Sequence, residues 1–259
     1  MELAGKVVVV TGGASGIGAA LCRRFADEDP QAIVVVDLDG DGADRVADEV
    51  GGTAVQADLS SRDGVTGAVN AVLGDHGRID LYCSNAGVPG GEQFSEDPDD
   101  WQRAWDVNVM AHVHAAHALL PGWLERGAGY LLGTVSAAGL LNHIFAAPYA
   151  ASKAAALSVM EWLAIAHGPD GIGVSALCPQ GVKTPMLEDD PTGFLAEDAM
   201  EPSAVADVVV EGLRDERFLI LPHPEVAEYA ARRGSDHDRW ITGMQRLRHR
   251  VVEAFPDLA

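Results

Sequence analysis

A tyrosine and a lysine lie four residues apart in the segment Tyr149-Ala-Ala-Ser-Lys153. On a helix this spacing places both side chains on one face, within reach of one ligand. A nearby ammonium favours phenolate over phenol, so we expect Lys153 to lower the pKa of Tyr149 toward the range of a general base. Tyr149 is therefore a candidate acid–base group for a hydroxyl proton, although the same pair is also common on protein surfaces.

A glycine-rich turn, Thr11-Gly-Gly-Ala-Ser-Gly-Ile-Gly18, follows the first apolar run and opens the first predicted helix. Its glycines permit a tight turn and a close approach of the backbone to a diphosphate at the helix N-terminus. A glycine cluster alone would indicate only a turn, but the flanking strand and helix predict a dinucleotide site. The predicted binding residues of the turn are Gly12, Ser15, Gly16, Ile17 and Gly18.

An aspartate, Asp37, ends the second predicted strand at the distance from the glycines that is typical of ribose recognition. Its carboxylate can accept hydrogen bonds from the ribose hydroxyls and repels a 2′-phosphate, and neither Leu38 nor Asp39 beside it is cationic. We therefore expect NAD, as NAD⁺ and NADH, to be preferred over NADP, unless Asp37 is only a solvated strand end. Leu38, Asp58 and Leu59 are assigned to the adenosine side, with a plain loop role for Asp58 left open.

Polar residues also follow the central strands. Ser136 stands at the end of the fifth predicted strand, where open α/β sheets present ligand-contacting groups, and its hydroxyl can hold a substrate oxygen. Asn85, in Asn85-Ala-Gly87, follows the fourth strand, and Asn108 falls in the long helix after it. Either asparagine is alternatively a cap or a turn residue.

The elements that must position these groups follow an alternating pattern of strands and helices. Apolar runs predict strands at Val7 to Val10, Ala32 to Val36, Thr53 to Gln56, Ile79 to Cys83, Tyr130 to Val135, Val174 to Cys178 and Phe218 to Leu221. Helical periodicity predicts helices at Gly16 to Asp27, Ala43 to Val50, Arg62 to Asp75, Trp101 to Leu124, Tyr149 to His167 and Ala204 to Arg214. This pattern predicts an α/β, Rossmann-like doubly wound parallel sheet of about seven strands with helices on both faces.

The end of the chain differs, because Glu225 to Arg233 and Asp238 to Phe255 predict two consecutive helices. One face of the second helix carries an apolar stripe of Trp240, Met244, Leu247, Val251 and Phe255. We expect residues 1–259 to form one domain with a C-terminal helical extension at 222–259. The stripe needs a partner, which is either the chain's own sheet layer or a second subunit of a homo-oligomer, a dimer or a tetramer.

Arginines are concentrated in the same stretch: Arg232, Arg233, Arg239, Arg246, Arg248 and Arg250. We expect them to form a solvated or salt-bridged face, because the chain around them is acidic.

Taken together, these motifs resemble the short-chain dehydrogenase/reductase family in its shorter, single-domain form, as far as about Pro185. TGGASGIG is similar to that family's TGxxxGxG turn, SNAG to its NNAG and YAASK to its YxxxK, with Ser136 at the usual distance before the tyrosine. The resemblance implies that Tyr149 is the catalytic acid/base, that Ser136 binds the substrate oxygen and that Lys153 binds the nicotinamide ribose. It also implies that Asn108 supports a proton relay, and that hydride passes between nicotinamide and a carbinol or carbonyl carbon.

Two positions depart from the family pattern. Ser84 replaces the first asparagine of NNAG, and Gln180 stands after Pro179 where the family usually has glycine. The resemblance still implies cofactor contacts from Pro179, Val182 and Thr184, and from the three residues Asn85, Ala86 and Gly87. The family's usual glycine-rich ending is absent.

Substrate selection is expected from the segments between Ser136 and Tyr149 and between Lys183 and Pro202. Apolar residues there favour a hydrophobic secondary alcohol or ketone, with a core position as the alternative for several of them: Leu140, Leu141, Ile144, Phe145, Met186, Leu187 and Phe194. The assigned substrate-binding residues are Ser136, His143, Phe145, Tyr149, Met186 and Leu187, with a plain loop position as the alternative for His143. The second segment is acidic, which disfavours acyl-carrier proteins and strongly anionic substrates: Glu188, Asp189, Asp190, Glu197, Asp198 and Glu201.

Composition excludes several classes of function. Eighteen Lys and Arg against 39 Asp and Glu give a net charge of −21, which disfavours nucleic-acid and membrane partners. Cys22, Cys83 and Cys178 are widely spaced and predicted to be core thiols, and no metal site is expected because His112 and His114 point to different helix faces. With neither a signal peptide nor a spanning segment in the sequence, a cytoplasmic protein is expected.

Three alternative functions are considered. The first is an NAD-sensing or interaction protein that has lost catalysis, but its expected mark, a broken Ser, Tyr and Lys set, is absent. The second is a 3-ketoacyl-type reductase, which the acidic segment disfavours. The third is a nucleotide-sugar epimerase or dehydratase, whose members are usually longer and carry a TGxxGxxG turn.

Overall fold

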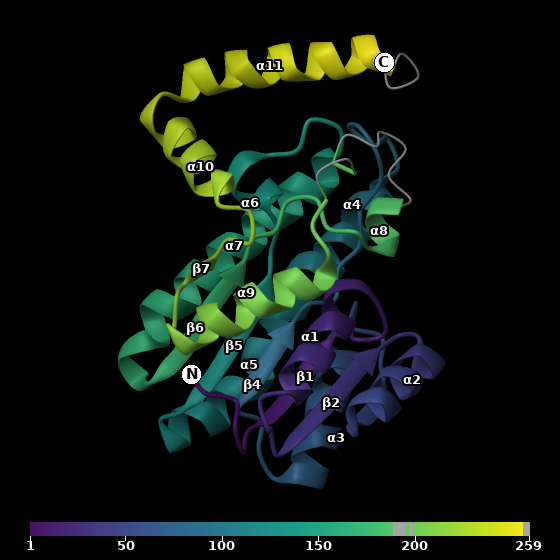
Figure 1. Ribbon diagram of the computed structural model, residues 1–259, viewed down its shortest axis with the longest axis vertical. Coiled ribbons are helices and arrows are strands. Elements are labelled where there is room, and N and C mark those ends of the chain that lie inside the picture. The colour runs from purple at the N-terminus through teal and green to yellow at the C-terminus, as the bar shows by residue number, and fades with distance from the viewer. Residues whose placement is uncertain (189–194, 197–198, 256–259) are drawn as a thin grey trace.

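The computed structural model describes residues 1–188, 195–196 and 199–255. Within these ranges the strands form one all-parallel sheet in the order β3-β2-β1-β4-β5-β6-β7 (Figure 1). Their bounds are β1 (Val7–Thr11), β2 (Ala32–Asp37), β3 (Thr53–Gln56), β4 (Leu81–Ser84), β5 (Gly129–Thr134), β6 (Ile172–Leu177) and β7 (Leu219–Ile220). The predicted Rossmann-like, doubly wound fold is confirmed.

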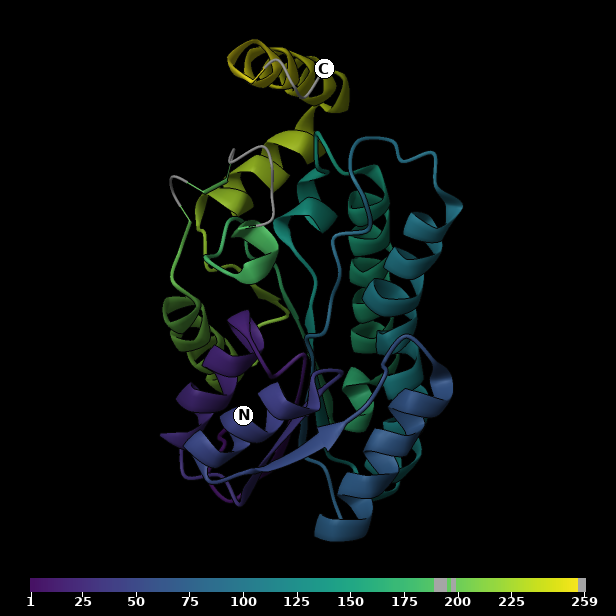
Figure 2. The ribbon, with the colours of Figure 1, turned by 90° about the vertical axis from the view of Figure 1, so that its right-hand side faces the viewer.

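Both faces of the sheet are covered by helices, because successive strand residues point to opposite sides and both sets are apolar. In β1, Val8 and Val10 pack with α1 (Gly16–Ala26), α2 (Gly40–Val50) and α9 (Pro202–Arg214). Val7 and Val9 pack instead with α3 (Arg62–His76), α5 (Ala111–Arg126) and α7 (Ala147–His167). Figure 2 shows the two helical layers on either side of the sheet.

The chain reverses its direction of strand addition between β1 and β4, which leaves a crevice at their carboxyl ends. Asn85, just after β4, links three strands there. Its backbone N–H donates to Thr11 Oγ1 at 2.8 Å, and its side-chain Nδ2 donates to the Thr11 carbonyl at 3.0 Å. Its Oδ1 accepts a hydrogen bond from Thr134 Oγ1 at 2.9 Å, so the ends of β1, β4 and β5 are held together.

The single helix predicted from Trp101 to Leu124 is wrong, because the structure interrupts it. It consists of α4 (Pro98–Trp105), a π-helical turn at Asp106–Met110 and α5. A π turn carries an extra residue and so changes which side chains face inward. Here it places the Asn108 side chain, which is fully buried, against the loop at Val88. Two short helices, α6 (Ala137–Leu141) and α8 (Pro185–Glu188), were also absent from the sequence prediction.

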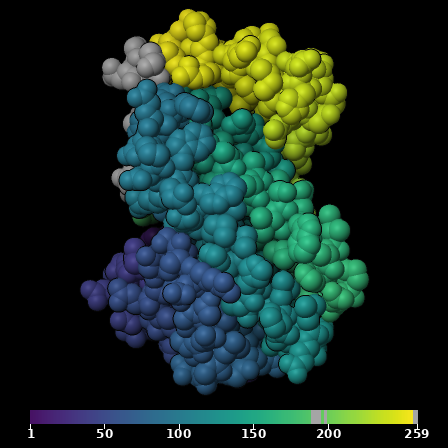
Figure 3. All heavy atoms as spheres, turned by 180° about the vertical axis from the view of Figure 1, so that it is seen from behind, coloured from purple at the N-terminus to yellow at the C-terminus, as the bar shows by residue number. Residues whose placement is uncertain are grey.

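The two predicted C-terminal helices are present as α10 (Glu225–Ser235) and α11 (His237–Ala254). They form a layer beyond the carboxyl end of the sheet (Figures 1 and 3). In the apolar stripe, Val251 is buried against Phe145, and Trp240 packs on the cluster around Leu141 and Val226. The stripe therefore packs on α6, on α10 and on the loop before α7 of its own chain, and not on the sheet layer. Its last residue, Phe255, is 46% exposed, and assembly with a second subunit stays a prediction.

The cysteines belong to the core of the protein. Cys22, Cys83 and Cys178 are buried free thiols, as predicted. Among the described residues no three His, Cys, Asp or Glu side chains are grouped as metal ligands. In the same part of the chain, no helix combines the length and apolarity that a membrane span requires.

Inside the fold, His112 connects α5 to the end of β4. The imidazole is fully buried, and its Nδ1 lies 2.7 Å from the Ser84 hydroxyl. Burial lowers the pKa of His112 to about 3, with a smaller contribution from the nearby Lys153 ammonium. The ring is therefore neutral at physiological pH, and Ser84, which replaces the family's asparagine, is its hydrogen-bond partner.

Replacing Gly18 with alanine is expected to destabilise the fold. A Cβ at this position would lie 2.0 Å from the Gly12 carbonyl oxygen and 2.8 Å from Asn85 Nδ2, so either the turn or α1 must move. We expect Gly18→Ala to lose at least about 1–3 kcal/mol of unfolding free energy in denaturant titrations. The matched control is Gly67→Ala in α3, where a Cβ meets nothing within 4 Å. Equal stability of the two variants would contradict the close approach.

His112 is expected to make stability sensitive to acid. Its pKa is about 3 in the folded protein and about 6.5 in the unfolded chain, so between these values the unfolded state binds one more proton. The stabilising contribution of neutral His112 to the unfolding free energy is complete above about pH 6.5. As the pH falls from there toward 3, the unfolding free energy decreases by about 1.4 kcal/mol per pH unit. The unfolding free energy should decline more steeply between pH 7 and pH 4 in wild type than in His112→Gln. The exposed His249→Gln serves as control, and parallel curves for wild type and His112→Gln would refute the assignment.

Candidate active site

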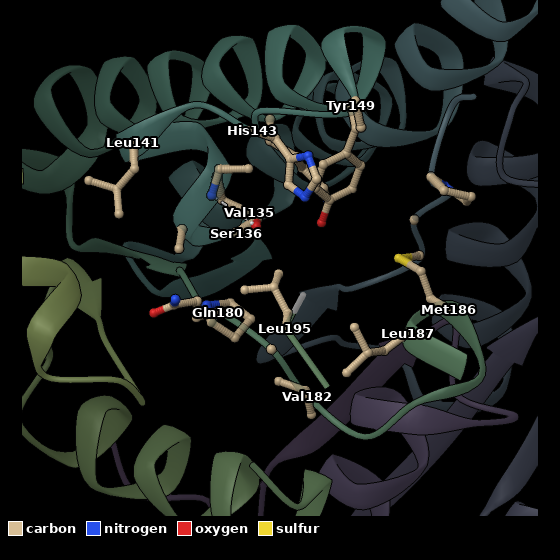
Figure 4. A pocket seen from close by; sticks show the side chains of 18 of the residues that line it. Val135, Ser136, Leu141, His143, Tyr149, Gln180, Val182, Met186, Leu187 and Leu195 are labelled. Atoms are coloured by element: carbon tan, nitrogen blue, oxygen red, sulfur yellow. Dashed lines mark hydrogen bonds between the residues drawn. The ribbon is translucent and has the colours of Figure 1, made fainter. Parts of the chain in front are cut away.

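A cavity of about 1650 Å³ lies at the carboxyl end of the sheet. Figure 4 shows part of it, with Tyr149 and His143 on one wall and Met186 and Leu187 opposite. The predicted site residues that line it are Gly12, Ser15, Gly16, Ile17, Asp37, Leu38, Asp58, Leu59, Asn85, Ala86, Gly87, Ser136, His143, Phe145, Tyr149, Lys153, Pro179, Val182, Thr184, Met186 and Leu187. Two predicted residues, Gly18 and Asn108, do not line the cavity and act behind its wall.

Ser136 and Tyr149 come from different elements and meet at this cavity. Ser136 precedes α6, and its Oγ accepts a hydrogen bond from the Ala138 N–H at 3.1 Å. The hydroxyl proton of Ser136 is therefore available for another oxygen. Burial raises the pKa of Tyr149, and a hydrogen bond from Ser136 opposes this rise in part. Both side chains therefore line the cavity near enough for the Ser136 hydroxyl to affect the pKa of Tyr149.

Lys153 lies one turn after Tyr149 on α7 and is only 3% exposed. Its Nζ donates to the Thr134 carbonyl at 2.9 Å and lies 5.7 Å from the centre of the Tyr149 ring. Burial lowers the pKa of Lys153 to about 8. The expected net lowering of the Tyr149 pKa is not found, because burial of the phenol is the largest effect on that pKa and raises it.

Asn108 positions the groups around Lys153. Its Oδ1 accepts from the Val88 N–H at 2.9 Å, while its Nδ2 donates to the Val88 carbonyl and to Ser152 Oγ, each at 3.0 Å. A Cβ on Gly87 would lie 3.2 Å from Asn108 Oδ1 and 3.4 Å from Lys153 Nζ. The side chain of Asn108 therefore connects the loop after β4 to α7.

The other end of the cavity fits a dinucleotide. Gly12 and Gly16 have positive φ angles of 62° and 51°, and the turn that contains them lies beside the end of β4. This open backbone lets a diphosphate approach the N-terminus of α1. Asp37 lies next to the turn, where its Oδ2 accepts from the Ala14 N–H at 3.0 Å and its Oδ1 from the Asp39 N–H at 3.0 Å. Each carboxylate oxygen retains capacity to accept a hydrogen bond from a ribose hydroxyl.

Asp58 also lines this end but has its own partner. Its Oδ1 accepts hydrogen bonds from the backbone N–H and the hydroxyl of Ser60, at 3.0 and 2.7 Å. These bonds lower the pKa of Asp58, so it is ionised at neutral pH. Both the adenosine contact and the loop role considered from the sequence are compatible with this geometry.

The segment after β6 crosses the cavity. Gln180 lines it, and the Gln180 N–H donates to Nδ1 of the buried His223 at 3.1 Å. His223 was not identified from the sequence, where nothing marked it as a partner of this loop. Further along, Thr184 approaches the glycine turn so closely that a Cβ on Gly16 would lie 3.0 Å from Thr184 Cγ2. The segment therefore connects the two ends of the cavity.

The predicted apolar wall is present in part. Leu141, Ile144 and Phe145 line the cavity together with Met186 and Leu187. Leu140, in α6, does not line the cavity but packs on the Val226 cluster, which is the core role that the sequence left open. Phe194 and the acidic residues Asp189, Asp190, Glu197 and Asp198 lie outside the described residues. Glu201 pairs with Lys183 at 2.6 Å.

The C-terminal helices contribute a wall that was missed. The residues of this wall are Tyr229, Arg232, Ser235, Asp236, Arg239, Trp240, Gly243, Met244, Arg246, Leu247 and Arg250. The apolar periodicity of α11 was visible in the sequence, but periodicity identifies a face and not its partner.

Comparison with known proteins agrees with this geometry. Residues 6–193 match the model of the short chain dehydrogenase family. The 1-deoxy-11-beta-hydroxypentalenate dehydrogenase of Streptomyces exfoliatus is 37% identical over 236 residues, covering 87% of this chain and 86% of that enzyme.

Solved structures agree as well. A short-chain dehydrogenase/reductase from Burkholderia phymatum in complex with NAD has a TM-score of 0.83 at 29% identity, covering 92% of this chain and 96% of that one. A short-chain dehydrogenase from Sphingobium yanoikuyae in complex with NADPH has a TM-score of 0.79 at 27% identity, covering 89% and 93%. With the sheet order, the glycine turn and the Ser136, Tyr149 and Lys153 set, these matches place the chain in the short-chain dehydrogenase family of oxidoreductases.

Proposed function

We propose that this protein is an NAD-dependent dehydrogenase or reductase that interconverts a hydrophobic secondary alcohol and its ketone, with Tyr149 as the acid/base. The observation that carries the proposal is the convergence of Ser136, Tyr149 and Lys153 on a cavity whose other end contains the glycine turn and Asp37. Loss of catalysis in a cofactor-sensing protein would remove at least one of these three side chains, and all three are present.

The proton is handled by Tyr149 and Ser136. For alcohol oxidation, Tyr149 accepts the hydroxyl proton, and for ketone reduction it donates that proton to the carbonyl oxygen. Ser136 donates a hydrogen bond to the same substrate oxygen, because its own Oγ already accepts from the Ala138 N–H. The pair holds the oxygen while its charge changes.

Lys153 supplies positive charge beneath the tyrosine. Its ammonium is held by the Thr134 carbonyl and lies 5.7 Å from the centre of the Tyr149 ring, so in its protonated form it favours the phenolate needed for oxidation. The hydrogen bond from Asn108 Nδ2 to Ser152 Oγ fixes the position of α7, the helix that carries both Tyr149 and Lys153. We assign Asn108 a positioning role.

A bound nicotinamide dinucleotide supplies the hydride acceptor or donor. The glycine turn would hold its diphosphate, and Asp37, Leu38, Asp58 and Leu59 would surround its adenosine. The nicotinamide would be flanked by Asn85, Ala86 and Gly87 on one side and by Pro179, Val182 and Thr184 across the cavity. Lys153 would bind the nicotinamide ribose.

Preference for NAD over NADP rests on charge. Asp37 carries a negative charge where the 2′-phosphate of NADP would lie, and no Lys or Arg is among the described residues that line this end of the cavity. Similar proteins have been solved with NAD and with NADPH, so the preference must come from this chain's own residues.

A hydrophobic alcohol is favoured by the wall opposite Tyr149. Met186, Leu187 and Leu195 face Tyr149 and His143 across the cavity (Figure 4). A relative at 37% identity is named as the dehydrogenase of a hydroxylated compound, 1-deoxy-11-beta-hydroxypentalenate. Both observations support oxidation of a hydroxyl group on an apolar framework.

Replacing Tyr149 with phenylalanine is expected to lower kcat/KM by about 100-fold to 10,000-fold for any alcohol found in a screen of cyclic and polycyclic secondary alcohols. Binding of NADH should persist. Tyr130→Phe removes another buried hydroxyl, hydrogen-bonded to Ser175 and outside the cavity, and is the matched control. If Tyr149→Phe retained most of the activity, the assignment of Tyr149 as the acid/base would be wrong.

The two reaction directions should differ in pH dependence. Burial raises the pKa of Tyr149, so below its ordinary value of about 10 the protonated phenol predominates. Oxidation needs the phenolate, and its kcat/KM should rise from pH 7 to pH 9. Reduction needs the phenol and should be nearly constant over this range. Initial rates in both directions provide the check, and a reduction rate that falls steeply over this range would conflict with a raised pKa.

Cofactor preference can be inverted if the charge argument holds. Wild type should bind NADH more tightly than NADPH in calorimetry. The double variant Asp37→Ser, Leu38→Arg removes the carboxylate and adds a guanidinium at an exposed lining position, and should bind NADPH about tenfold or more tightly than wild type does. Asp41→Ser removes the same charge outside the cavity lining and should change neither affinity. Tighter binding of NADPH by wild type would contradict the preference.

A further inference from the structure

Two parallel stripes of α11 face the cavity. One is the apolar set of Trp240, Met244 and Leu247, and the other contains Arg239, Gly243, Arg246 and Arg250. Both sets follow steps of three and four residues, so each occupies one line along the helix. The cavity wall opposite the sheet is therefore apolar along one line and cationic along the adjacent line.

The arginines of the second stripe are not neutralised by the described residues. No carboxylate in the described ranges forms an ion pair with Arg239, Arg246 or Arg250. The neighbouring Arg232, by contrast, pairs with Glu228 at 3.3 Å. Arg246 and Arg250 are one turn apart, where like charges repel and destabilise a helix. Arg246 and Arg250 are exposed, so their repulsion costs only about 0.2–0.5 kcal/mol, and an anion bound between them would relieve it.

The half of α11 that carries this pair is fixed to the cavity wall. Val251 and Leu247 pack against Phe145 and Ile144. The Arg248 guanidinium lies 5.4 Å above the Phe145 ring and donates to Gln93 Oε1 at 3.0 Å. These contacts hold Arg246 and Arg250 beside the segment that leads to Tyr149.

Other charged residues line the cavity at different places. Asp236 caps the first turn of α11 by accepting from the Arg239 N–H at 2.9 Å, so its charge lies at the Arg239 end of the stripe. Glu92 and Arg103 also line the cavity, and Asp37 and Asp58 belong to the dinucleotide end. Arg246 and Arg250 remain as the adjacent cationic pair on α11.

We propose that Arg246 and Arg250 bind a carboxylate of the substrate, so that the enzyme acts on hydrophobic hydroxy acids or keto acids. The proposal rests on the function proposed above and specifies its substrate class. The apolar framework lies along Leu247, Met244 and the Phe145 wall, with the hydroxyl carbon at Tyr149 and the carboxylate at the arginine pair. Guanidinium groups suit this role, since they form paired hydrogen bonds with a carboxylate.

This substrate class differs from the expectation drawn from the acidic segment between Lys183 and Pro202. The described part of that segment contains α8, whereas the arginine pair lies on α11. Glu201, the described carboxylate at the end of that segment, is already paired with Lys183. A monocarboxylate that enters along α11 meets the cationic stripe.

The test compares cyclic secondary alcohols of one, two and four rings, each bearing a carboxylate, with their methyl esters. We expect kcat/KM with NAD to be about tenfold or more higher for at least one acid than for its ester. The double variant Arg246→Gln, Arg250→Gln should abolish this difference by slowing the acid and leaving the ester within about twofold. Arg45→Gln, Arg217→Gln removes the same charge from exposed sites away from the cavity and should preserve the difference.

Equal kcat/KM for every acid and its ester in wild type would overturn the inference, as would a variant that slows acid and ester alike. A coenzyme A thioester of a hydroxy acid preferred over all free acids would also overturn it, because the anion recognised would then be a phosphate.

Failure of the proposed function gives a different result. In that case no acid or ester is oxidised, and the comparison moves to calorimetric binding of the acids and of their uncharged amides. Tighter binding of an acid than of its amide, lost in the Arg246, Arg250 variant, would still support the carboxylate site. Equal binding would reject it.

Discussion

The close packing of α1 on the end of β1 is the constraint on which the rest of the site depends. Gly18 lies so near the Gly12 carbonyl that a methyl group would be only 2.0 Å from that oxygen. This approach leaves the N-terminus of α1 open toward the crevice beside β4, and the hydrogen bonds of Asn85 hold the ends of β1, β4 and β5 in register around it. The shape of the dinucleotide end of the cavity is therefore determined first by the close approach of the α1 backbone to the turn after β1, and only secondarily by side chains that would contact a ligand.

The chemical end depends on buried polar groups that satisfy one another. The Lys153 ammonium is buried with a partner, because the Thr134 carbonyl accepts a hydrogen bond from it. Helix α7 is held by the hydrogen bond from Asn108 to Ser152, and Asn108 also donates to the Val88 carbonyl. A buried ammonium and a buried phenol have opposite responses to desolvation, since burial lowers the pKa of Lys153 and raises that of Tyr149. The two groups therefore titrate further apart than they would in water, so Lys153 loses its proton before Tyr149 does as the pH rises.

Much of this arrangement could be predicted from the sequence, because it follows from local patterns. Continuous apolar runs predicted the buried parallel strands, and the order of glycine turn, Asp37, Ser136 and Tyr149-x-x-x-Lys153 predicted which strand ends would meet. The break in the helix at Asn108 could not be predicted, since it depends on bonds to Val88 and Ser152 from distant parts of the chain. The raised pKa of Tyr149 likewise depends on burial by the whole fold. The role of α11 as a wall of the cavity could not be predicted either, because an amphipathic pattern identifies an apolar face but not the surface that packs against it.

The central claim is that one cavity joins a dinucleotide at the glycine turn to proton transfer at Tyr149. The most direct measurement is a crystal structure of the protein with NADH bound. The account predicts the diphosphate at the N–H groups of Gly12 to Gly18, the adenosine ribose at Asp37, and the nicotinamide between Tyr149 and Val182. A dinucleotide bound elsewhere, or a nicotinamide that turns away from Tyr149, would contradict it.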